Sequence, residues 1–398
     1  MGGLGHVGLP LGLALAKVGH LVCLVDINQH AVNMVNNKEL PFLEEGALDI
    51  LKEVIGKNLR ANTNRNALKE ADIVFFVTGT PVDEHHNPRI QDVVKVIEDY
   101  LPYLRKEMLI ILRSTVYPGV IELIDNLLKE HFSCSSSPIT ASAPTSPIKL
   151  AFCPERIVQG KGIEEIFQLP QIVSATSQEA EEEAATLFST VAPKIIRLKP
   201  KEAEVAKLMT NAWRYIEFAI ANQFYMITES QELDFYRIFN AVRDDYPRAQ
   251  HFPRPGLAAG PCLFKDTMQL SAFHKNNFFL GQSAMLVNEG LPVFLVDQME
   301  KKLGGVGQLK GKKIAILGMS FKANNDDTRE SLAFKVKKIL KIKMATPLIT
   351  DSYLKDKDNL PLASALEIAD GIILGVPHKE YLSLKISKPY VDCWGVWK

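Results

Sequence analysis

Short apolar segments alternate along the chain with stretches whose apolar positions recur every three or four residues. The short segments have the length of buried strands, and the longer stretches have the period of helices packed on one face. This alternation is typical of parallel sheets covered by helices. The segments predicted to be strands are residues 20–25, 73–77, 108–112, 172–175, 195–198, 313–317, 348–351, 371–376 and 390–392.

The middle of the chain has a different pattern. Residues 202–229 contain no proline or glycine and are predicted to form one long helix, and further helices are expected at 234–242 and 283–302. Four glycines between 304 and 311 then indicate a linker before the second group of strands. Residues 133–147 are rich in Ser, Pro and Thr and are expected to form a surface loop.

The chain begins with a glycine-rich motif. Gly3, Gly5 and Gly8 match GxGxxG, and Asp26 ends the first predicted strand eighteen residues later. In dinucleotide-binding folds such glycines let the backbone approach a pyrophosphate, and the acid binds the adenosine ribose. The pattern favours NAD over NADP. A glycine turn that only packs a helix against a strand is the alternative. The predicted fold class is α/β, with two Rossmann-like doubly wound domains joined by a long central helix.

One element of this fold is not found in the sequence. The glycine motif should follow a β-strand, but only Met1 and Gly2 precede Gly3. We therefore expect the first strand of the N-terminal domain to be missing, either because it has been lost or because the start of the chain was taken too late. Since that strand is central and buried on both faces, its absence is expected to weaken both the fold and NAD binding.

Composition and charge narrow the class of protein. The 398 residues are 46% apolar and 23% charged, as in a soluble protein of two or three domains. The net charge is zero and the basic residues are scattered, so no nucleic-acid or membrane surface is indicated. Five widely spaced cysteines indicate neither a disulfide framework nor a metal site. A reducing cytoplasm fits this pattern, and no metal is expected.

Cys262 is the candidate nucleophile. It follows the small residues Gly260 and Pro261 and precedes Lys265 and Asp266. A thiol among small residues with a cation nearby can ionise and attack a carbonyl carbon. The alternative is a buried cysteine that acts as a small hydrophobic residue.

These motifs, taken in order, resemble the UDP-glucose/GDP-mannose dehydrogenase family over essentially the whole chain. Each matching segment is short, but the order and spacing of the segments are specific. The matching segments are Gly5-His6-Val7-Gly8-Leu9-Pro10, Thr80-Pro81, Ser114-Thr115 with Pro118-Gly119, Pro154-Glu155-Arg156, Lys207 with Asn211, Pro247-Arg248, Gly260-Pro261-Cys262 with Lys265-Asp266, and residues 318–331 around Phe321-Lys322 and Asp327-Thr328-Arg329.

The resemblance implies three domains and a four-electron reaction. An NAD-binding domain is expected at 1–199, a central helical dimerisation region at 200–303 and a UDP-sugar-binding domain at 304–398. The C6 alcohol of a UDP-sugar would be oxidised to the acid in two NAD-dependent steps, through a thiohemiacetal and a thioester on Cys262. Lys207 and Asn211 lie four residues apart on one helix face, and would stabilise the developing oxyanion. For Lys207 the alternative is a solvated helix lysine.

Family members also suggest roles for other residues. Asp266, with Thr115 and Glu155, would move protons through water. A helix N-cap is the structural alternative for Asp266, and a surface charge is the alternative for Arg329. The residues predicted to bind NAD are Gly3, Gly5, Val7, Gly8, Asp26, Thr80, Lys265 and Arg329, and those predicted to bind the substrate are Arg248, Gly260, Phe321 and Lys322. Because Arg248 would reach the sugar nucleotide of a second subunit, a homodimer is expected.

The sequence indicates the sugar of the substrate less strongly than it indicates the family. Residues 288–292 resemble the helix start of family members that act on UDP-N-acetylhexosamines, particularly UDP-N-acetyl-D-mannosamine, whereas Lys265-Asp266 is more like the UDP-glucose enzymes. We expect UDP-N-acetyl-D-mannosamine, with UDP-glucose or UDP-N-acetylglucosamine as alternatives. A protein of another class, a truncated and inactive binding or oligomerisation protein, is also considered. Leu257 and Ala259 stand where the family usually has glycines, so the pocket is expected to be reshaped.

Overall fold

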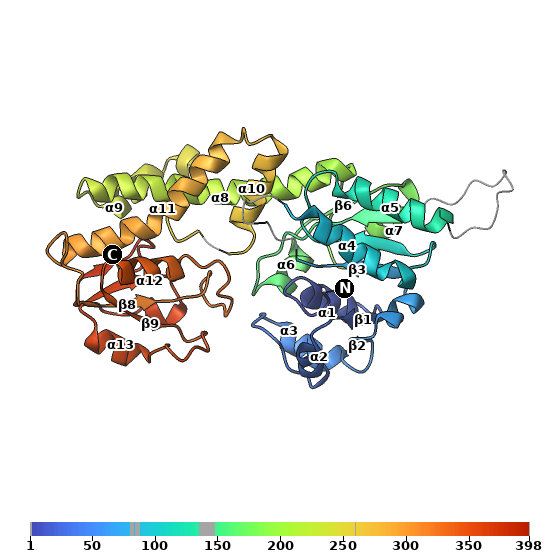
Figure 1. The fold of residues 1–398 in the computed structure, drawn as a ribbon, viewed down its shortest axis with the longest axis horizontal. Coiled ribbons are helices and arrows are strands. Elements are labelled where there is room, and N and C mark those ends of the chain that lie inside the picture. The colour runs from blue at the N-terminus through green and yellow to red at the C-terminus, as the bar shows by residue number, and fades with distance from the viewer. Residues whose placement is uncertain (1, 80–82, 84–87, 135–147, 259, 398) are drawn as a thin grey trace. The chain divides into compact units, whose positions relative to one another are not determined.

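The computed structural model describes residues 2–79, 83, 88–134, 148–258 and 260–397, with the side chain of Cys134 left out. The chain divides into two compact units, Met1–Met209 and Thr210–Lys398 (Figure 1). Each unit contains parallel β-structure covered by helices, so the protein is α/β as the alternating pattern predicts. The expected loop at 133–147 falls almost entirely outside the described residues, as do Thr80 and Ala259.

The first unit contains two separate sheets. β1 (Val22–Val25) pairs in parallel with β2 (Leu59–Asn62). The second sheet has the order β3-β4-β5-β6-β7, and all its pairs are parallel except β5 with β6. Its strands are β3 (Ile73–Phe76), β4 (Leu109–Leu112), β5 (Lys149–Phe152), β6 (Gln171–Ala175) and β7 (Ile195–Arg197). All four residues of β4 are buried, as expected for a strand with helices on both faces.

The helices of this unit follow the strands in sequence. They are α1 (Gly8–Lys17), α2 (Gln29–Asn36), α3 (Ala47–Val54), α4 (Ile90–Tyr100), α5 (Val120–Cys134), α6 (Gly162–Gln168) and α7 (Gln178–Ser189), with short 3-10 turns η1 (Arg65–Glu70) and η2 (Leu101–Tyr103). The described residues ahead of β1 form the glycine turn and α1. β1 and β3 belong to different sheets and are not hydrogen-bonded to each other.

α8 (Pro200–Ser230) is the long central helix, and it contains 31 residues. It starts at a proline, which is tolerated in the first helical turn because that position needs no backbone donor. No further proline or glycine interrupts it. The predicted helix at 202–229 is therefore confirmed, with the boundaries moved by one or two residues.

The second unit has a parallel sheet of order β11-β10-β8-β9. The strands are β8 (Lys313–Leu317), β9 (Thr346–Thr350), β10 (Gly371–Leu374) and β11 (Tyr390–Val391). The helices are α9 (Phe235–Arg243), α10 (Leu263–Phe273), α11 (Phe279–Lys302), α12 (Ala333–Ile342) and α13 (Leu362–Ile368), with 3-10 turns η3 (Pro247–Ala249) and η4 (Lys379–Tyr381). Ile314 and Ile316 of β8 are fully buried and pack in a cluster with residues of α11 and α12.

Among the described residues, α11 is the one helix long and apolar enough to cross a membrane by length and composition. Its residues Leu291, Leu295, Val296 and Met299 are fully buried against the sheet of the second unit. The helix also contains Asn288 and Pro292. These contacts are those of a core helix, which buries its apolar face in the protein.

Candidate functional site

The turn between the amino end and α1 is packed tightly against β1. A Cβ atom on Gly3 would lie 3.1 Å from the backbone nitrogen of Val25, and one on Gly8 would lie 2.7 Å from the carbonyl oxygen of Gly2. A larger residue at either position would displace the turn. A Cβ atom on Gly5 would meet the Gly2 carbonyl oxygen at an ordinary 3.6 Å. Packing within the protein therefore does not by itself require glycine at position 5.

Asp26 links this turn to the carboxyl end of β1. Its Oδ2 atom accepts a hydrogen bond of 3.0 Å from the backbone N–H of Leu4, and Oδ1 accepts one of 3.0 Å from Asn28. Val7 occupies the N-cap of α1. A glycine turn, a helix amino end and a carboxylate at the end of the next strand fit the pyrophosphate and ribose of NAD. The structure thus brings together the predicted NAD-binding residues of this region.

Thr115 and Glu155 follow neighbouring strands. β4 and β5 are parallel and end at the pair Leu112 and Phe152, so both residues lie at the same edge of the sheet. Glu155 is largely buried, and its Oε2 atom accepts a hydrogen bond of 2.8 Å from Nε of Arg113. Oxygen Oε1 accepts from the next two backbone N–H groups, at 2.6 and 2.7 Å. If Glu155 transfers protons as proposed, it does so while bound to the guanidinium of Arg113.

Arg113 is a residue of this region that the sequence did not reveal. Only 2% of it is exposed, and besides Glu155 it donates to Oε1 of Gln171 at 2.9 Å and to the Cys153 carbonyl at 3.1 Å. Its guanidinium also lies 5.2 Å from the ring centre of Phe188. A buried arginine with several partners holds a carboxylate in one orientation. Arg113 thus fixes Glu155.

Cys262 is exposed and occupies the N-cap of α10. The N–H groups and dipole at the start of a helix stabilise a thiolate. By contrast, burial raises the pKa of the Cys153 thiol to about 12 and that of Cys393 well above its usual value, so both stay protonated at neutral pH. Among the cysteine side chains that the structure describes, Cys262 is the one exposed thiol. The alternative that Cys262 is a buried, small hydrophobic residue is wrong.

Arg329 interacts electrostatically with Cys262. The pKa of Arg329 is raised, mainly by its hydrogen bond to Asp327, and the charge of Cys262 contributes in the same direction. Atoms Nε and Nη2 of Arg329 bind the Asp327 carboxylate at 2.6–3.0 Å. A guanidinium that is stabilised by a thiolate also favours the thiolate. Arg329 is thus more than a simple surface charge, because it interacts specifically with Asp327 and with Cys262.

Asp266 lies one helical turn after Cys262 and is fully buried. Its Oδ2 atom accepts a hydrogen bond of 2.5 Å from Nδ2 of Asn211, and Oδ1 lies 2.7 Å from Nζ of Lys265. The structure thus brings three predicted residues together. The N-cap alternative for Asp266 is wrong, because α10 begins at Leu263 and places Asp266 within its first turn.

Lys207 and Asn211 lie on one face of α8, as their spacing predicts. They are 7% and 4% exposed, respectively. The alternative that Lys207 is a solvated surface lysine is therefore wrong. Burying an ammonium group is costly unless other groups stabilise its charge, so a buried lysine is a candidate for a functional role.

Gly260 lies against the ring of Phe321. Its φ angle is +103°, and a Cβ atom there would be 2.7 Å from Cδ2 of Phe321. Only glycine satisfies both conditions. The segment before Cys262 is thereby fitted to the segment that carries Phe321 and Lys322, two predicted substrate-binding residues. Arg248, in η3, is exposed, and its Nη1 atom lies 3.4 Å from the hydroxyl oxygen of Tyr246.

A buried amide network anchors the same segment. The amide of Asn222 accepts from the N–H of Gly256 at 2.8 Å and donates to the carbonyl of Gly256 at 3.0 Å and to Oδ1 of Asn288 at 2.9 Å. Nδ2 of Asn288 donates to the Tyr215 carbonyl at 3.0 Å. Asn288 lies inside α11, which begins at Phe279, four residues before the predicted start at 283.

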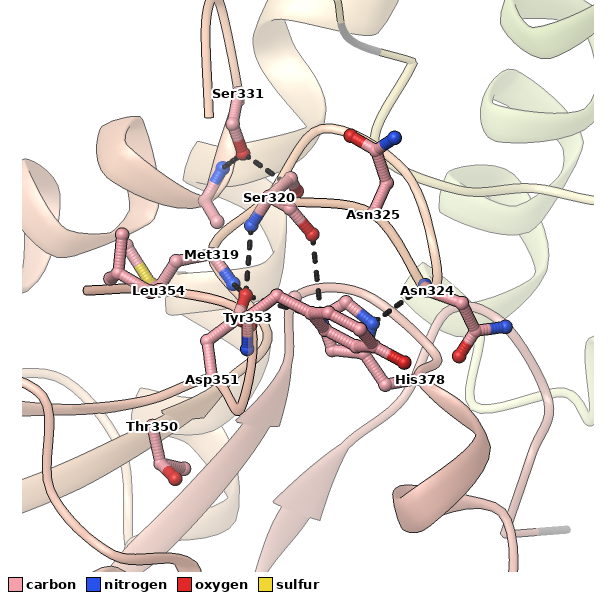
Figure 2. A network of polar contacts seen from close by, with 12 residues as sticks. Met319, Ser320, Asn324, Asn325, Ser331, Thr350, Asp351, Tyr353, Leu354 and His378 are labelled. Carbon is pink, nitrogen blue, oxygen red and sulfur yellow. Dashed lines mark hydrogen bonds and ion pairs between the residues drawn. The ribbon is translucent and has the colours of Figure 1, made fainter. Parts of the chain in front are cut away.

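In the second unit, three loops meet at the carboxyl edge of the sheet. Ser320, Asp351 and His378 follow the neighbouring strands β8, β9 and β10, and Figure 2 shows their side chains in one network. Oδ2 of Asp351 accepts from the N–H groups of Met319 and Ser320 at 2.7 and 3.0 Å, and lies 3.1 Å from Nε2 of His378. Nδ1 of His378 accepts from the N–H of Asn324 at 2.8 Å. In neutral His378, Nε2 therefore carries the proton.

This network holds the loop that carries Phe321 and Lys322. Burial alone raises the pKa of Asp351, but the hydrogen bond and charge of His378, together with backbone donors, outweigh burial and lower it. The carboxylate is thus charged at neutral pH. Nδ2 of Asn325, on the same loop, is buried and has no hydrogen-bond partner among the described residues. A polar ligand at this edge would satisfy that donor.

We expect His378→Ala to loosen this loop. The substitution leaves the N–H of Asn324 without its acceptor and Asp351 without its side-chain donor, and should destabilise the protein by about 1–3 kcal/mol. The KM for the sugar nucleotide should rise several-fold while kcat changes little. Thermal unfolding and steady-state kinetics measure these effects, with His378→Asn as partial rescue and the exposed His30→Ala as control. A loss of stability with unchanged KM would show that the network does not position the loop for binding.

Models of one known family match most of the chain. Three family models match: the NAD-binding domain of the UDP-glucose/GDP-mannose dehydrogenase family at residues 1–192, its central domain at 201–289 and its UDP-binding domain at 315–398. UDP-N-acetyl-D-mannosamine dehydrogenase of Campylobacter jejuni is 30% identical over 98% of both chains. NDP-N-acetyl-D-galactosaminuronic acid dehydrogenase of Ralstonia nicotianae is 28% identical over 99% of this chain and 95% of its own.

A solved structure agrees with these sequence matches. The UDP-D-ManNAc dehydrogenase of Pyrococcus horikoshii superimposes with a TM-score of 0.86 at 26% identity, covering 96% of this chain and 90% of that one. The chain therefore belongs to the UDP-glucose/GDP-mannose dehydrogenase family, and is an NAD-dependent nucleotide-sugar dehydrogenase. The resemblance stated from the motifs is confirmed.

Proposed function

We propose that this chain oxidises the C6 alcohol of UDP-N-acetyl-D-mannosamine to the uronic acid. The observation that carries the reaction is the exposed Cys262 thiol at the amino end of α10, one turn from the buried pair of Asp266 and Asn211. The sugar is supported by the activities for which the Campylobacter and Pyrococcus relatives are named, at about 30% identity or less. UDP-glucose and UDP-N-acetylglucosamine are the alternative substrates.

The reaction needs a nucleophile because an aldehyde gives up a hydride readily only as a tetrahedral adduct. NAD held at the glycine turn and Asp26 would supply the hydride acceptor for both oxidations. Cys262 adds to the C6 aldehyde to form a thiohemiacetal, whose oxidation gives a thioester that water hydrolyses to the acid and the free thiol. Arg329 and the α10 amino end favour the thiolate.

The buried polar groups have complementary roles. One N–H of the Asn211 amide donates to Asp266, and the other is directed by that bond and can donate to the oxyanion of each tetrahedral adduct. Lys207, on the same helix face, adds its positive charge. Asp266 accepts the proton of the attacking water, with Thr115 and Glu155 completing the proton path.

The same proposal includes the organisation of the chain. An NAD-binding domain at 1–199, a central region at 200–303 and a UDP-sugar-binding domain at 304–398 are proposed, with Rossmann-like doubly wound first and last domains. Lys265 and Arg329 would contact NAD, and Gly260, Phe321 and Lys322 the sugar nucleotide. The exposed Arg248 would reach a second subunit of a cytoplasmic homodimer.

A substrate panel read by NADH absorbance tests the proposed function. We expect two NADH per sugar and a kcat/KM for UDP-N-acetyl-D-mannosamine at least about tenfold above those for UDP-glucose and UDP-N-acetylglucosamine, because a pocket that binds the N-acetyl group discriminates against sugars that misplace or lack it. A preference for UDP-glucose would overturn the proposal that UDP-N-acetyl-D-mannosamine is the preferred substrate. If NAD binding cannot be detected by calorimetric titration and no sugar is oxidised, the alternative of an inactive binding protein holds.

A further inference from the structure

The segment that leads to Cys262 begins at Gly256, and a buried asparagine side chain binds the backbone there. Asn222 of α8 is fully buried. Its Oδ1 atom accepts from the N–H of Gly256 at 2.8 Å, and its Nδ2 atom donates to the carbonyl of the same residue at 3.0 Å. One side chain thus binds both backbone polar groups of one residue, as the partner residue in an antiparallel ladder does.

A second buried amide, that of Asn288 in α11, sets the orientation of the first. The carbonyl of Tyr215 can only accept, so Asn288 turns Nδ2 toward it, at 3.0 Å, and Oδ1 toward Asn222. Because that oxygen also only accepts, Asn222 presents Nδ2 to it at 2.9 Å and Oδ1 to the N–H of Gly256. A flipped amide at either position would bring two donors or two acceptors together. The network therefore has a single polarity.

Trp394 covers Gly256 at its α-carbon. A Cβ atom on Gly256 would lie 2.3 Å from Cζ3 of the Trp394 ring. The ring itself is held by a hydrogen bond of 3.1 Å from Nε1 to the Gly375 carbonyl. Its backbone belongs to a turn in which the Asp392 carboxylate accepts from the N–H groups of residues 394–397 at 2.6–3.0 Å. We call the contacts of Asn222 and Trp394 with Gly256 the Gly256 clamp.

α8 holds the segment with the nucleophile at both of its ends. Asn211 and Asn222 lie eleven positions apart, about three helical turns, and so share one face of α8. Asn222 binds Gly256, and Asn211 donates to Asp266 of α10 at 2.5 Å. Cys262 lies between these two points of attachment. Since the helix fixes their separation at roughly 16 Å along its axis, both contacts restrict where Cys262 can lie.

Buried residues connect the Gly256 clamp with Cys262. The two residues after Gly256, Leu257 and Ala258, are 3% and 4% exposed. They belong to different core clusters, and that of Ala258 includes Tyr215 of α8. In a closely packed interior such residues cannot shift independently of their neighbours. A displacement at Gly256 would therefore pass along the segment toward Cys262.

We propose that Asn222, oriented by Asn288 and opposed by Trp394, is a positioning residue for the Cys262 thiol. The proposal rests on the proposed function, in which the thiol adds to the C6 aldehyde before the aldehyde leaves. An error of about 1 Å in the position of a reacting group can lower a rate by about a hundredfold. Because the first oxidation does not use the thiol, the Gly256 clamp controls how much of the aldehyde becomes acid.

The fate of the aldehyde in Asn222→Leu tests the proposal. Leucine has the same branched shape as asparagine but can bind neither polar group of Gly256. The NADH yield should fall from two per sugar toward one, and the rate of acid formation should fall at least about tenfold. Semicarbazide added to the reaction should trap the released aldehyde, while the KM for the sugar nucleotide changes little. Asn288→Ala, which keeps both bonds to Gly256 but frees the Asn222 amide to turn, should have a smaller effect in the same direction.

Lys388→Met is the matched control for loss of stability. Nζ of Lys388 donates to three carbonyls at the carboxyl end of α13, at 2.6–2.7 Å. Its loss should lower the midpoint of thermal unfolding but leave two NADH per sugar, because fewer folded molecules change the rate and not the product ratio. A yield of two NADH per sugar in Asn222→Leu as well would show that Asn222 serves stability alone, and the proposal would be wrong.

A second pair of variants tests the other side of the Gly256 clamp, and serves where Asn222→Leu does not fold. The φ angle of Gly256 lies outside the left-handed region, and the three atoms nearest to a Cβ there all belong to the Trp394 ring. Gly256→Ala should therefore release aldehyde because of that ring. Adding Trp394→Leu removes the clash and should restore part of the acid yield. A double variant that releases as much aldehyde as Gly256→Ala alone would exclude Trp394 from the clamp.

Hydrogen exchange separates a failure of this inference from a failure of the proposed function. The N–H of Gly260 donates to the Glu330 carbonyl at 3.4 Å, and its exchange requires neither sugar nor NAD. It should be at least about tenfold faster in Asn222→Leu than in Lys388→Met, since exchange of a bonded amide requires local opening. If this amide responds but the parental chain forms no acid, the proposed function fails and the clamp is supported. Equal exchange in the two variants would contradict the clamp whatever the chain oxidises.

Discussion

Replacing Cys262 with alanine is expected to abolish formation of the uronic acid while leaving the binding of NAD and UDP-sugar largely intact. The thiol is exposed and at the amino end of α10, where it can form the covalent adduct, and it is not among the residues proposed to bind NAD or the sugar nucleotide. Removal of a nucleophile from a covalent mechanism lowers turnover by orders of magnitude, and we expect a loss of at least about a thousandfold. Product analysis and NADH yield measure the effect.

Cys262→Ser is the matched variant, because serine retains the size of the side chain but has a much weaker nucleophile at neutral pH. Both variants should bind NAD and UDP-sugar in calorimetric titration with nearly parental affinity. Any residual turnover should produce one NADH per sugar, with the aldehyde as the product, since the first oxidation does not require the thiol. Acid formation by the alanine variant at near the parental rate would rule out the covalent mechanism.

The sequence predicted those elements that depend on local patterns. β8 has the bounds expected from its apolar run, and α8 follows from the absence of proline and glycine after Pro200. β2 was not predicted, because the polar residues Arg60 and Asn62 interrupt its apolar positions. The segment becomes a strand through its pairing with β1.

The buried polar networks could not be predicted in the same way. In the sequence, Asn222 is one amide within a long helix, and Arg113 is one basic residue before Ser114. Their importance lies in partners far along the chain, Gly256 and Asn288 for Asn222 and Glu155 for Arg113. Because a buried polar group is stable only when its hydrogen bonds are made, identifying such residues requires the tertiary contacts.

Local rules also suggested one alternative at the site that the structure rules out. Asp266 resembles an N-cap because the residues that follow can form a helix, but α10 already begins at Leu263. The positive φ angle of Gly260 ends the preceding segment and lets the helix begin directly after Cys262. Asp266 is therefore free of a capping role, and its carboxylate is bound by Asn211 and Lys265. The earlier helix start is also what places Cys262 at the helix dipole.

Lys207→Ala is expected to lower kcat by about a hundredfold to a thousandfold, the usual cost of removing one group that stabilises an oxyanion. Lys207 is 7% exposed and shares a face of α8 with Asn211, so its charge acts in a site shielded from water, where electrostatic stabilisation is strong. The oxyanion develops only during the reaction, so the KM should change little. Steady-state kinetics measures both parameters.

Two variants control for loss of charge and for damage to the helix. Lys201→Ala removes an exposed lysine from the same helix and should leave both parameters near parental values. Lys207→Arg keeps the positive charge but changes its geometry, so part of the lost kcat should return. A Lys207→Ala variant with raised KM and unchanged kcat would instead make Lys207 a residue that binds the substrate in its ground state. In that case the oxyanion would be stabilised without this lysine, and the amide of Asn211 would be the principal donor.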